Sequence, residues 1–179
     1  MRPPLQPRDQ RRPVDAMPQA HGPILETRRL DWPNEAACAA SATALAAAPG
    51  LADALVELRG ELGAGKTTFA RHLLRALGVA GRIKSPTYAL IEPYEAGALA
   101  IAHCDLYRLA DPREWADAGL REVFAGPGLK LVEWPERAGG LLPLADLRME
   151  LQALDEDRRH VNVHALTPRG RRLLAALTP

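Results

Sequence analysis

Apolar and polar positions along this chain follow two patterns that alternate. Short segments such as 54–58 and 129–133 are apolar at nearly every position, which is typical of strands covered on both faces. Helical patterns occupy the segments between them, and no internal repeat interrupts the alternation. Strands that alternate with helices predict βαβ units and a largely parallel sheet.

Capping and breaker residues set the limits of the predicted elements. Asn34 can cap a helix that Pro49 and Gly50 end, and Gly78 follows a second helix. A turn at 96–97 predicts a hairpin of antiparallel strands. The predicted strands are 24–31, 54–58, 87–94, 99–107, 129–133, 147–154 and 160–166, and the predicted helices are 34–48, 67–77, one or two within 112–124, and 168–177.

Composition separates the first residues from the rest of the chain. Residues 1–22 are rich in Pro, Arg and Gln and contain no apolar run. They cannot bury enough surface to offset the entropy of ordering, so we expect a disordered N-terminal arm. Residues 23–179 carry the whole α/β pattern and are expected to form a single domain, which is long enough to bury a core without disulfides.

Charge and cysteine content exclude several classes of protein. The formal net charge of +1 produces no global field that would attract nucleic acid or an anionic membrane. The apolar stretches are far shorter than the ~20 residues of a membrane span. Cys38 and Cys104 lie in no CxxC motif and no Cys/His cluster, so we expect reduced thiols in a soluble, cytoplasmic protein. Any contact with RNA is expected to be local or made through a partner.

The segment GELGAGKT, residues 60–67, matches the phosphate-binding pattern G-x-x-x-x-G-K-[ST] between a predicted strand and a predicted helix. Glycines let backbone N–H groups point at phosphates, and the helix N-terminus adds partial positive charge. By chance the pattern would occur in roughly one chain of this length per hundred or fewer. The predicted nucleotide-binding residues here are Gly60, Leu62, Gly63, Ala64, Gly65, Lys66, Thr67 and Thr68. The predicted fold is therefore α/β, a three-layer P-loop NTPase-like fold with a largely parallel central sheet and antiparallel edge strands.

Three side chains of this loop have distinct predicted roles. Lys66 brings a mobile cation to the terminal phosphates and is a candidate catalytic residue. Thr67 offers its hydroxyl to Mg²⁺, and Thr68 can reach the region of the α-phosphate. The chain has neither the N-K-x-D motif nor the D-x-x-G motif of GTPases, which favours ATP. The expected cofactors are ATP and Mg²⁺.

Two acidic residues end apolar runs and are candidates for the metal site. Glu133 closes the run Leu-Lys-Leu-Val, and Asp105 follows Ile-Ala-His-Cys. An acid after several apolar strand residues is desolvated unless it meets a cation, which is the physical reason to expect Mg²⁺ beside it. Glu133 is predicted to be a metal ligand together with Thr67, and to be catalytic. For Asp105 two roles remain open, polarising the attacking water or positioning a loop.

Weaker candidates lie in the segments between these motifs. Residues 84–88 follow the helix after the phosphate loop, where related ATPases often place a switch that senses the γ-phosphate. Ser85 and Thr87 are therefore the predicted switch residues. His103 is more often a satisfied strand histidine than a catalyst, and Arg108 is more often solvated than an arginine finger.

Four segments, GELGAGKTTFAR, KSPTYALIEPY, HCDLYRLADP and LVEWPER, occur in this order and together resemble the bacterial family of the tRNA threonylcarbamoyladenosine biosynthesis protein TsaE. The likeness covers about residues 24–166. The resemblance implies a small P-loop ATPase that works with the partners TsaB and TsaD. Together they would place a threonylcarbamoyl group on the adenosine next to the anticodon of tRNAs reading codons that begin with A. The tRNA would be reached indirectly, through the complex, and slow ATP hydrolysis would act as a nucleotide switch.

The resemblance also implies roles for single residues. Asp105 would be needed for the ATPase cycle, Thr87 would be a switch residue, and Trp134 would neighbour the metal site. The adenine would lie at the mouth of the loop, near Glu35 and near the turn at Asp157. These two positions complete the predicted nucleotide-binding set.

Two other functions are compatible with the same motifs. One is a P-loop small-molecule kinase in which residues 108–126 form an Arg-bearing lid. The other is a nucleotide-sensing binding module without useful turnover, in which Asp105 and Glu133 serve structure alone. A kinase would phosphorylate an acceptor metabolite, whereas a sensor would bind ATP tightly and release no product.

Overall fold

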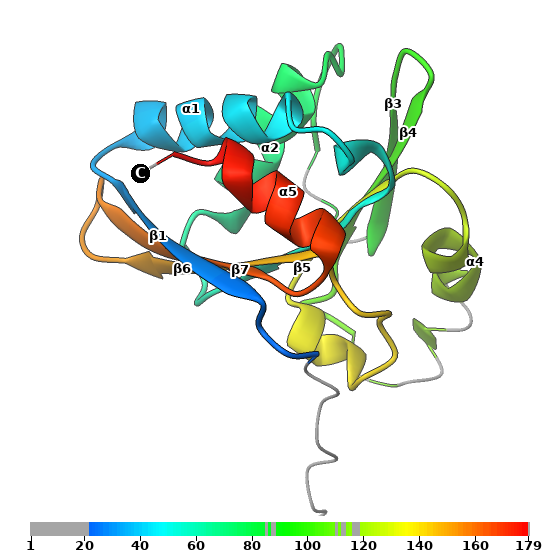
Figure 1. The fold of residues 1–179 in the computed structure, drawn as a ribbon. Coiled ribbons are helices and arrows are strands. Elements are labelled where there is room, and N and C mark those ends of the chain that lie inside the picture. Colours follow the sequence, from blue (N-terminus) through cyan, green and yellow to red (C-terminus); the bar gives the residue numbers. More distant parts are fainter. Residues whose placement is uncertain are drawn as a thin grey trace, which may run out of the picture.

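The computed structural model describes residues 22–84, 86, 89–109, 111, 114–115 and 119–178. A seven-stranded sheet crosses them in the order β1-β7-β6-β2-β5-β4-β3 (Figure 1). The strands are β1 Glu26–Trp32, β2 Leu55–Arg59, β3 Ile91–Ala96, β4 Leu99–Asp105, β5 Leu129–Glu133, β6 Leu147–Ala153 and β7 Arg159–Ala165. The helices are α1 Glu35–Ala46, α2 Lys66–Ala76, α4 Leu120–Ala125 and α5 Pro168–Ala176, with the 3-10 turns η1 Leu51–Asp53 and η2 Pro135–Ala138.

The centre of the sheet is parallel and its edges are antiparallel. β2 pairs in parallel with both β5 and β6, and β4 pairs in parallel with β5. At one edge β7 runs antiparallel to β6 and β1, and at the other β3 and β4 form the expected hairpin. The fold class that the sequence predicts is confirmed.

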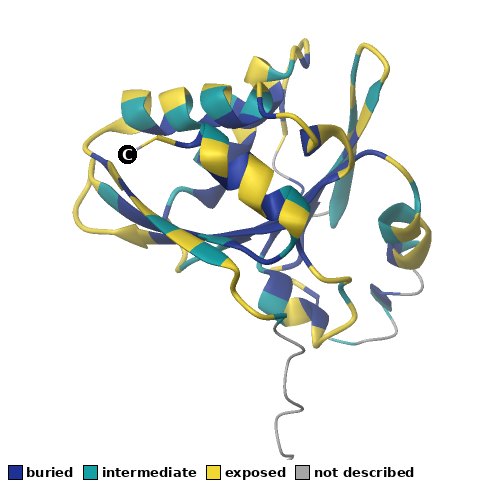
Figure 2. Cartoon of the chain, viewed as in Figure 1, coloured by how far each residue is buried: buried dark blue, intermediate teal, exposed yellow. Residues whose placement is uncertain are grey.

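Two apolar cores cover the two faces of the sheet. On one face α1, α2 and α5 pack against the strands through a larger core that includes Leu45, Phe69 and Leu173. On the other face a smaller core joins α4 and η2 to the sheet through Leu120 and Ala138. Figure 2 shows the buried side of the helices turned toward the strands. The resulting three layers leave the ends of the central strands to form the site.

Some element limits differ from the predicted ones for local reasons. α1 starts as expected, because the Asn34 side chain accepts a hydrogen bond from the Ala37 N–H at 3.1 Å. β3 begins at Ile91, later than predicted, because Leu90 has a left-handed backbone with φ of 58° and donates its N–H to Pro86 O. Residues 1–21 of the predicted arm lie outside the described residues, as do residues 112–113 and 116–118 of the predicted helical segment 112–124. No helix within the described ranges is both long and apolar enough to cross a membrane.

The carboxyl ends of the parallel strands meet at one edge of the sheet. β2 leads into the phosphate loop there, and β4 and β5 end with Asp105 and Glu133. These two acids face each other in the strand register. Open α/β sheets bind ligands in the crevice outside the carboxyl ends of their strands, so this edge is where a site is expected.

Candidate nucleotide-binding site

The glycines of the loop between β2 and α2 allow the backbone to curl. Gly60, Gly63 and Gly65 have φ values of 141°, 80° and 102°, a region that favours glycine. A Cβ on Gly60 would lie 2.3 Å from the Leu151 carbonyl oxygen, so no larger residue fits this position. The curl places the N-terminus of α2, which begins at Lys66, against the loop. Main-chain N–H groups at such a terminus attract anions.

Lys66 is held inside the curled loop. Its side chain is almost fully buried, with 4% exposed, and its Nζ donates to the carbonyl oxygens of Gly60 at 2.6 Å and Glu61 at 2.8 Å. The same Nζ lies 3.9 Å from the centre of the Trp134 ring. Burial lowers the pKa of Lys66, and nearby carboxylates, Glu133 first, act against that shift.

Thr67 and Glu133 meet across the end of the loop. The Thr67 hydroxyl donates to Glu133 Oε2 at 2.8 Å, from the first turn of α2 to the end of β5. This bond occupies the hydroxyl proton and leaves the oxygen lone pairs available. Glu133 is 1% exposed, and its other oxygen accepts from His103 Nε2 at 2.8 Å.

Asp105 lies beside Glu133 at the end of the next strand. Its carboxylate accepts a hydrogen bond from the Tyr107 N–H at 3.0 Å. Burial raises the pKa of Asp105, and the negative charge of Glu133 adds to that rise, while the Tyr107 hydrogen bond opposes it. Two carboxylates so close to Lys66 form a site of mixed charge in which a further cation would be stabilised.

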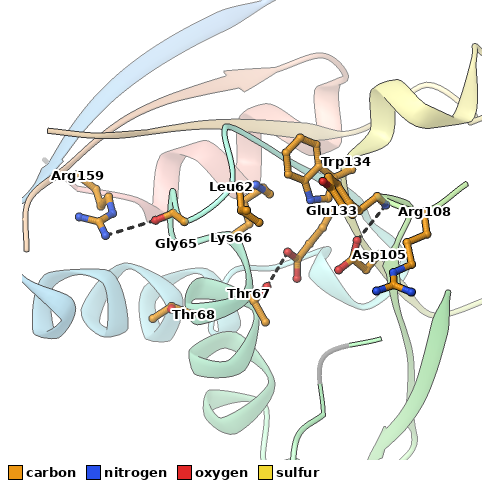
Figure 3. Close-up of a pocket in the computed structure, with 12 residues that line it drawn as sticks. Leu62, Gly65, Lys66, Thr67, Thr68, Asp105, Arg108, Glu133, Trp134 and Arg159 are labelled. Carbon is orange, nitrogen blue, oxygen red and sulfur yellow. Dashed lines mark hydrogen bonds between the residues drawn. The ribbon is translucent and has the colours of Figure 1, made fainter. Parts of the chain in front are cut away.

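A cavity of about 380 Å³ lies over the loop (Figure 3). In this view Thr67 and Glu133 point toward each other, while Arg159 and Arg108 lie at opposite ends of the row of residues. Predicted residues line most of it: Leu62, Gly63, Gly65, Lys66, Thr67, Thr68, Asp105 and Glu133. Gly60 and Ala64 are not in its wall, and they shape the loop from behind, where Ala64 is 1% exposed.

A second cavity of about 130 Å³ adjoins the first one. The two share Gly65, Thr68 and Arg159 in their walls. The second also contains Glu35 and Asp157, the two residues predicted near the adenine. The Glu35 carboxylate is engaged by His72 Nε2 at 2.9 Å. The structure therefore brings the predicted phosphate and base residues into adjoining cavities.

The sequence did not reveal several residues of the site. Arg159 donates from Nε to Ala64 O at 3.1 Å and from Nη1 to the carbonyls of the turn that precedes it. Its only signal in the sequence is its position after the acidic turn near Asp157. Tyr107 and Arg108 also line the cavity, and Tyr107 contacts Trp134 with ring centres 5.0 Å apart. Their signal is their position two and three residues after a strand-end acid.

The remaining predicted residues concern the switch and the metal. Ser85 and Thr87 lie outside the described residues, so their role stays a prediction. Within the described part of the chain no group of three or more His, Cys, Asp and Glu side chains could hold a metal ion. Thr67 with Glu133 nevertheless fits Mg²⁺, because this ion keeps several waters and needs only one or two protein ligands beside substrate phosphates.

Comparisons with known proteins agree with this geometry. Residues 32–161 match the family model described as threonylcarbamoyl adenosine biosynthesis protein TsaE. The chain is similar to the tRNA threonylcarbamoyladenosine biosynthesis protein TsaE of Haemophilus influenzae, with 42% identity over 69% of this chain and 78% of the relative. The protein of the same name from Bacillus subtilis is 37% identical over 84% of this chain and 95% of the relative. The crystal structure of YdiB from Bacillus subtilis superposes with a TM-score of 0.70 and 31% identity, covering 85% of this chain and 94% of that one.

Proposed function

This chain belongs to the threonylcarbamoyl adenosine biosynthesis protein TsaE family. From that premise we propose that it is a magnesium-dependent ATPase of tRNA threonylcarbamoyladenosine biosynthesis. Family membership supports a part in this tRNA modification. The observation that carries the ATPase proposal is the 2.8 Å hydrogen bond between Thr67 and Glu133 at the end of the phosphate loop. It joins a hydroxyl and a carboxylate, the two groups that would hold Mg²⁺ beside the phosphates.

The two adjoining cavities support a complete nucleotide as ligand. Phosphates would lie over the loop, next to the main-chain N–H groups at the start of α2 and Lys66. The base would lie in the smaller cavity beside Glu35 and Asp157. Gly65 and Thr68 line both cavities, which supports a position of the α-phosphate and ribose at their junction.

The side chains of the site divide the expected chemistry among them. On nucleotide binding Lys66 would leave the carbonyls of Gly60 and Glu61, both of which can then accept from water, and would donate to the terminal phosphates. Thr67 and Glu133 would hold Mg²⁺, which, when bound, neutralises charge that develops on the phosphate oxygens. Asp105 lies beside Glu133 with a raised pKa, and in this position it can orient or polarise the attacking water.

Partners are proposed from the family as well. TsaB and TsaD type proteins would bind this ATPase, and tRNA would be reached through their complex. Leu62, with 79% of its surface exposed, and Tyr107, with 43%, line the proposed nucleotide cavity. Apolar and aromatic side chains that are exposed beside a ligand site are suited to contact with a partner protein. We therefore propose a nucleotide switch whose turnover is slow until partners complete the site.

One experiment tests the proposed reaction against the alternatives. The purified chain is mixed with ATP and Mg²⁺, with and without TsaB and TsaD, and ADP, phosphate and phosphorylated metabolites are measured. We expect hydrolysis that the partner pair stimulates and that Glu133→Gln slows. A phosphorylated acceptor would indicate a kinase instead. Tight ATP binding with no product, even with partners present, would indicate a sensing module.

A further inference from the structure

A histidine behind the metal pair takes part in building the site. His103 lies in β4, and its side chain is fully buried, on the sheet face that carries α2. Its Nε2 is 2.8 Å from Glu133 Oε1. The neighbouring strand register puts His103 beside Leu131, two positions before Glu133, so its ring reaches forward to the carboxylate.

The two oxygens of Glu133 are thus fixed separately. Oε2 accepts from Thr67 and Oε1 accepts from His103, each at 2.8 Å. A glutamate side chain has several rotatable bonds and loses conformational entropy when it is fixed. A partner on each oxygen sets both its position and the rotation of its carboxylate plane. Ligating carboxylates in metal sites are generally held by such outer hydrogen bonds.

The two ring nitrogens of His103 differ in their contacts: among the described residues only Nε2 has a hydrogen-bond partner, Glu133. Nδ1 is buried and has no hydrogen-bond partner among the described residues. A buried polar atom without a partner costs free energy, so a histidine serving stability alone would be poorly suited to this position. An apolar residue would fill the same space without that cost.

From these contacts we infer that His103 is a positioning residue for the metal site: its Nε2 holds Glu133 in the orientation that completes Mg²⁺ binding with Thr67. The inference rests on the proposed function, because it needs a nucleotide-bound Mg²⁺ at this pair. It assigns to His103 no contact with ATP and no proton transfer. Its effect is therefore confined to the part of nucleotide affinity that depends on Mg²⁺.

Two amide variants test this with matched chemistry. His103→Gln can place its amide N–H near the position of Nε2, whereas the amide of His103→Asn ends near the position of Nδ1 and cannot reach Glu133. Titration calorimetry measures ATP binding to each variant with Mg²⁺ and with EDTA. We expect His103→Asn to lose about 10-fold or more of the Mg²⁺-dependent affinity, the usual effect of removing an outer partner of a metal ligand. His103→Gln should keep most of it, and the affinities in EDTA should be alike.

The outcomes distinguish this inference from the proposed function. If the parent binds ATP equally well with and without Mg²⁺, or does not bind it, the proposed function fails and this inference with it. If the parent depends on Mg²⁺ and His103→Asn retains the same dependence, this inference alone is overturned. An equal loss in both amide variants would also overturn it, because the reach to Glu133 would then not matter.

A measurement on the unaltered protein decides the matter if His103→Asn does not fold. The ring nitrogens of the five histidines are observed by nitrogen NMR, and the His103 signal is assigned from its disappearance in His103→Gln. Adding Mg²⁺ to the complex with a non-hydrolysable ATP analogue should shift the Nε2 signal of His103, because its carboxylate partner meets the ion. An unchanged Nε2 signal would overturn the inference.

Discussion

Replacing Lys66 with methionine should leave the stability of the protein nearly unchanged and weaken its binding of nucleotide. Methionine keeps most of the length and volume of the side chain and removes its charge. It also keeps a favourable contact with the Trp134 ring, since thioether sulfur packs well against aromatic rings. The carbonyls of Gly60 and Glu61 lose a donor, but neither residue is buried, so water can replace it.

The direction of the stability effect follows from the pKa of Lys66. Burial lowers this pKa from the ordinary value of 10.5, so folding carries a cost for the charged form. That cost is fully present below the lowered pKa, where lysine is charged in both states. The cost disappears as pH rises from the lowered pKa to 10.5, because in this range Lys66 is neutral in the folded protein but still holds its proton in the unfolded chain. At pH 7 the free energy of unfolding of Lys66→Met should be at most about 1 kcal/mol below that of the parent, and it can exceed it. The stability of the parent rises toward pH 10.5, and the variant should lose the part of this rise that comes from Lys66.

The loss of binding free energy for nucleotide in Lys66→Met should be larger than this change in stability. A hydrogen bond to a charged group contributes about 1.5–3 kcal/mol. One such bond from Lys66 to a terminal phosphate corresponds to a roughly 10- to 150-fold change in dissociation constant. Urea denaturation gives the stability, and titration calorimetry with ATP and Mg²⁺ gives the affinity.

Lys130→Met is the matched control for this measurement. Lys130 is also buried, with 7% exposed, and burial likewise lowers its pKa. It lies in the wall of a separate cavity near Asp53 and Gly126, which shares no residue with the nucleotide cavities. Its replacement should leave ATP affinity unchanged. The reasoning is refuted if Lys66→Met binds ATP like the parent, or if it loses several kcal/mol of stability.

Three further predictions concern residues outside the phosphate loop. Arg159→Met should weaken ATP binding about tenfold, because it removes hydrogen bonds to the loop and to the 155–158 turn. In calorimetry the affinity for inorganic triphosphate should fall less than the affinity for ATP. An equal fall for both ligands would contradict a role of Arg159 in shaping the base cavity. Thr167→Ala removes the N-cap of α5 and the hydrogen bond from its hydroxyl to the buried Asp146 carboxylate. It should cost about 1–3 kcal/mol in urea denaturation, with unchanged ATP affinity. Burial raises the pKa of Cys38 and Cys104 to about 12, so iodoacetamide at pH 8 should label the two thiols only when urea unfolds the protein. Rapid labelling of the native protein, detected by mass spectrometry, would contradict their burial.

Local chemistry explains how much of the fold the sequence predicted. The strand Leu129–Glu133 was predicted with its observed limits, because five buried positions in a row leave a short strand little freedom. Asn34 was a correct prediction since its side chain caps the helix from three residues away. β3 was predicted to start too early, because leucine rarely adopts a left-handed backbone and the sequence therefore gives no sign of the one at Leu90.

The sequence by itself determined the phosphate loop, because glycines, a lysine and a helix start within eight residues need no distant partner to form an anion site. The tertiary structure alone decided what surrounds it. Thr67 meets Glu133, 66 residues away, only because β2 and β5 are neighbours. His103 reaches that carboxylate through the register of β4 on β5, and Arg159 returns to Ala64 from 95 residues away. Such contacts depend on strand order and register, which arise from the packing of the whole sheet and have no signature in any one segment.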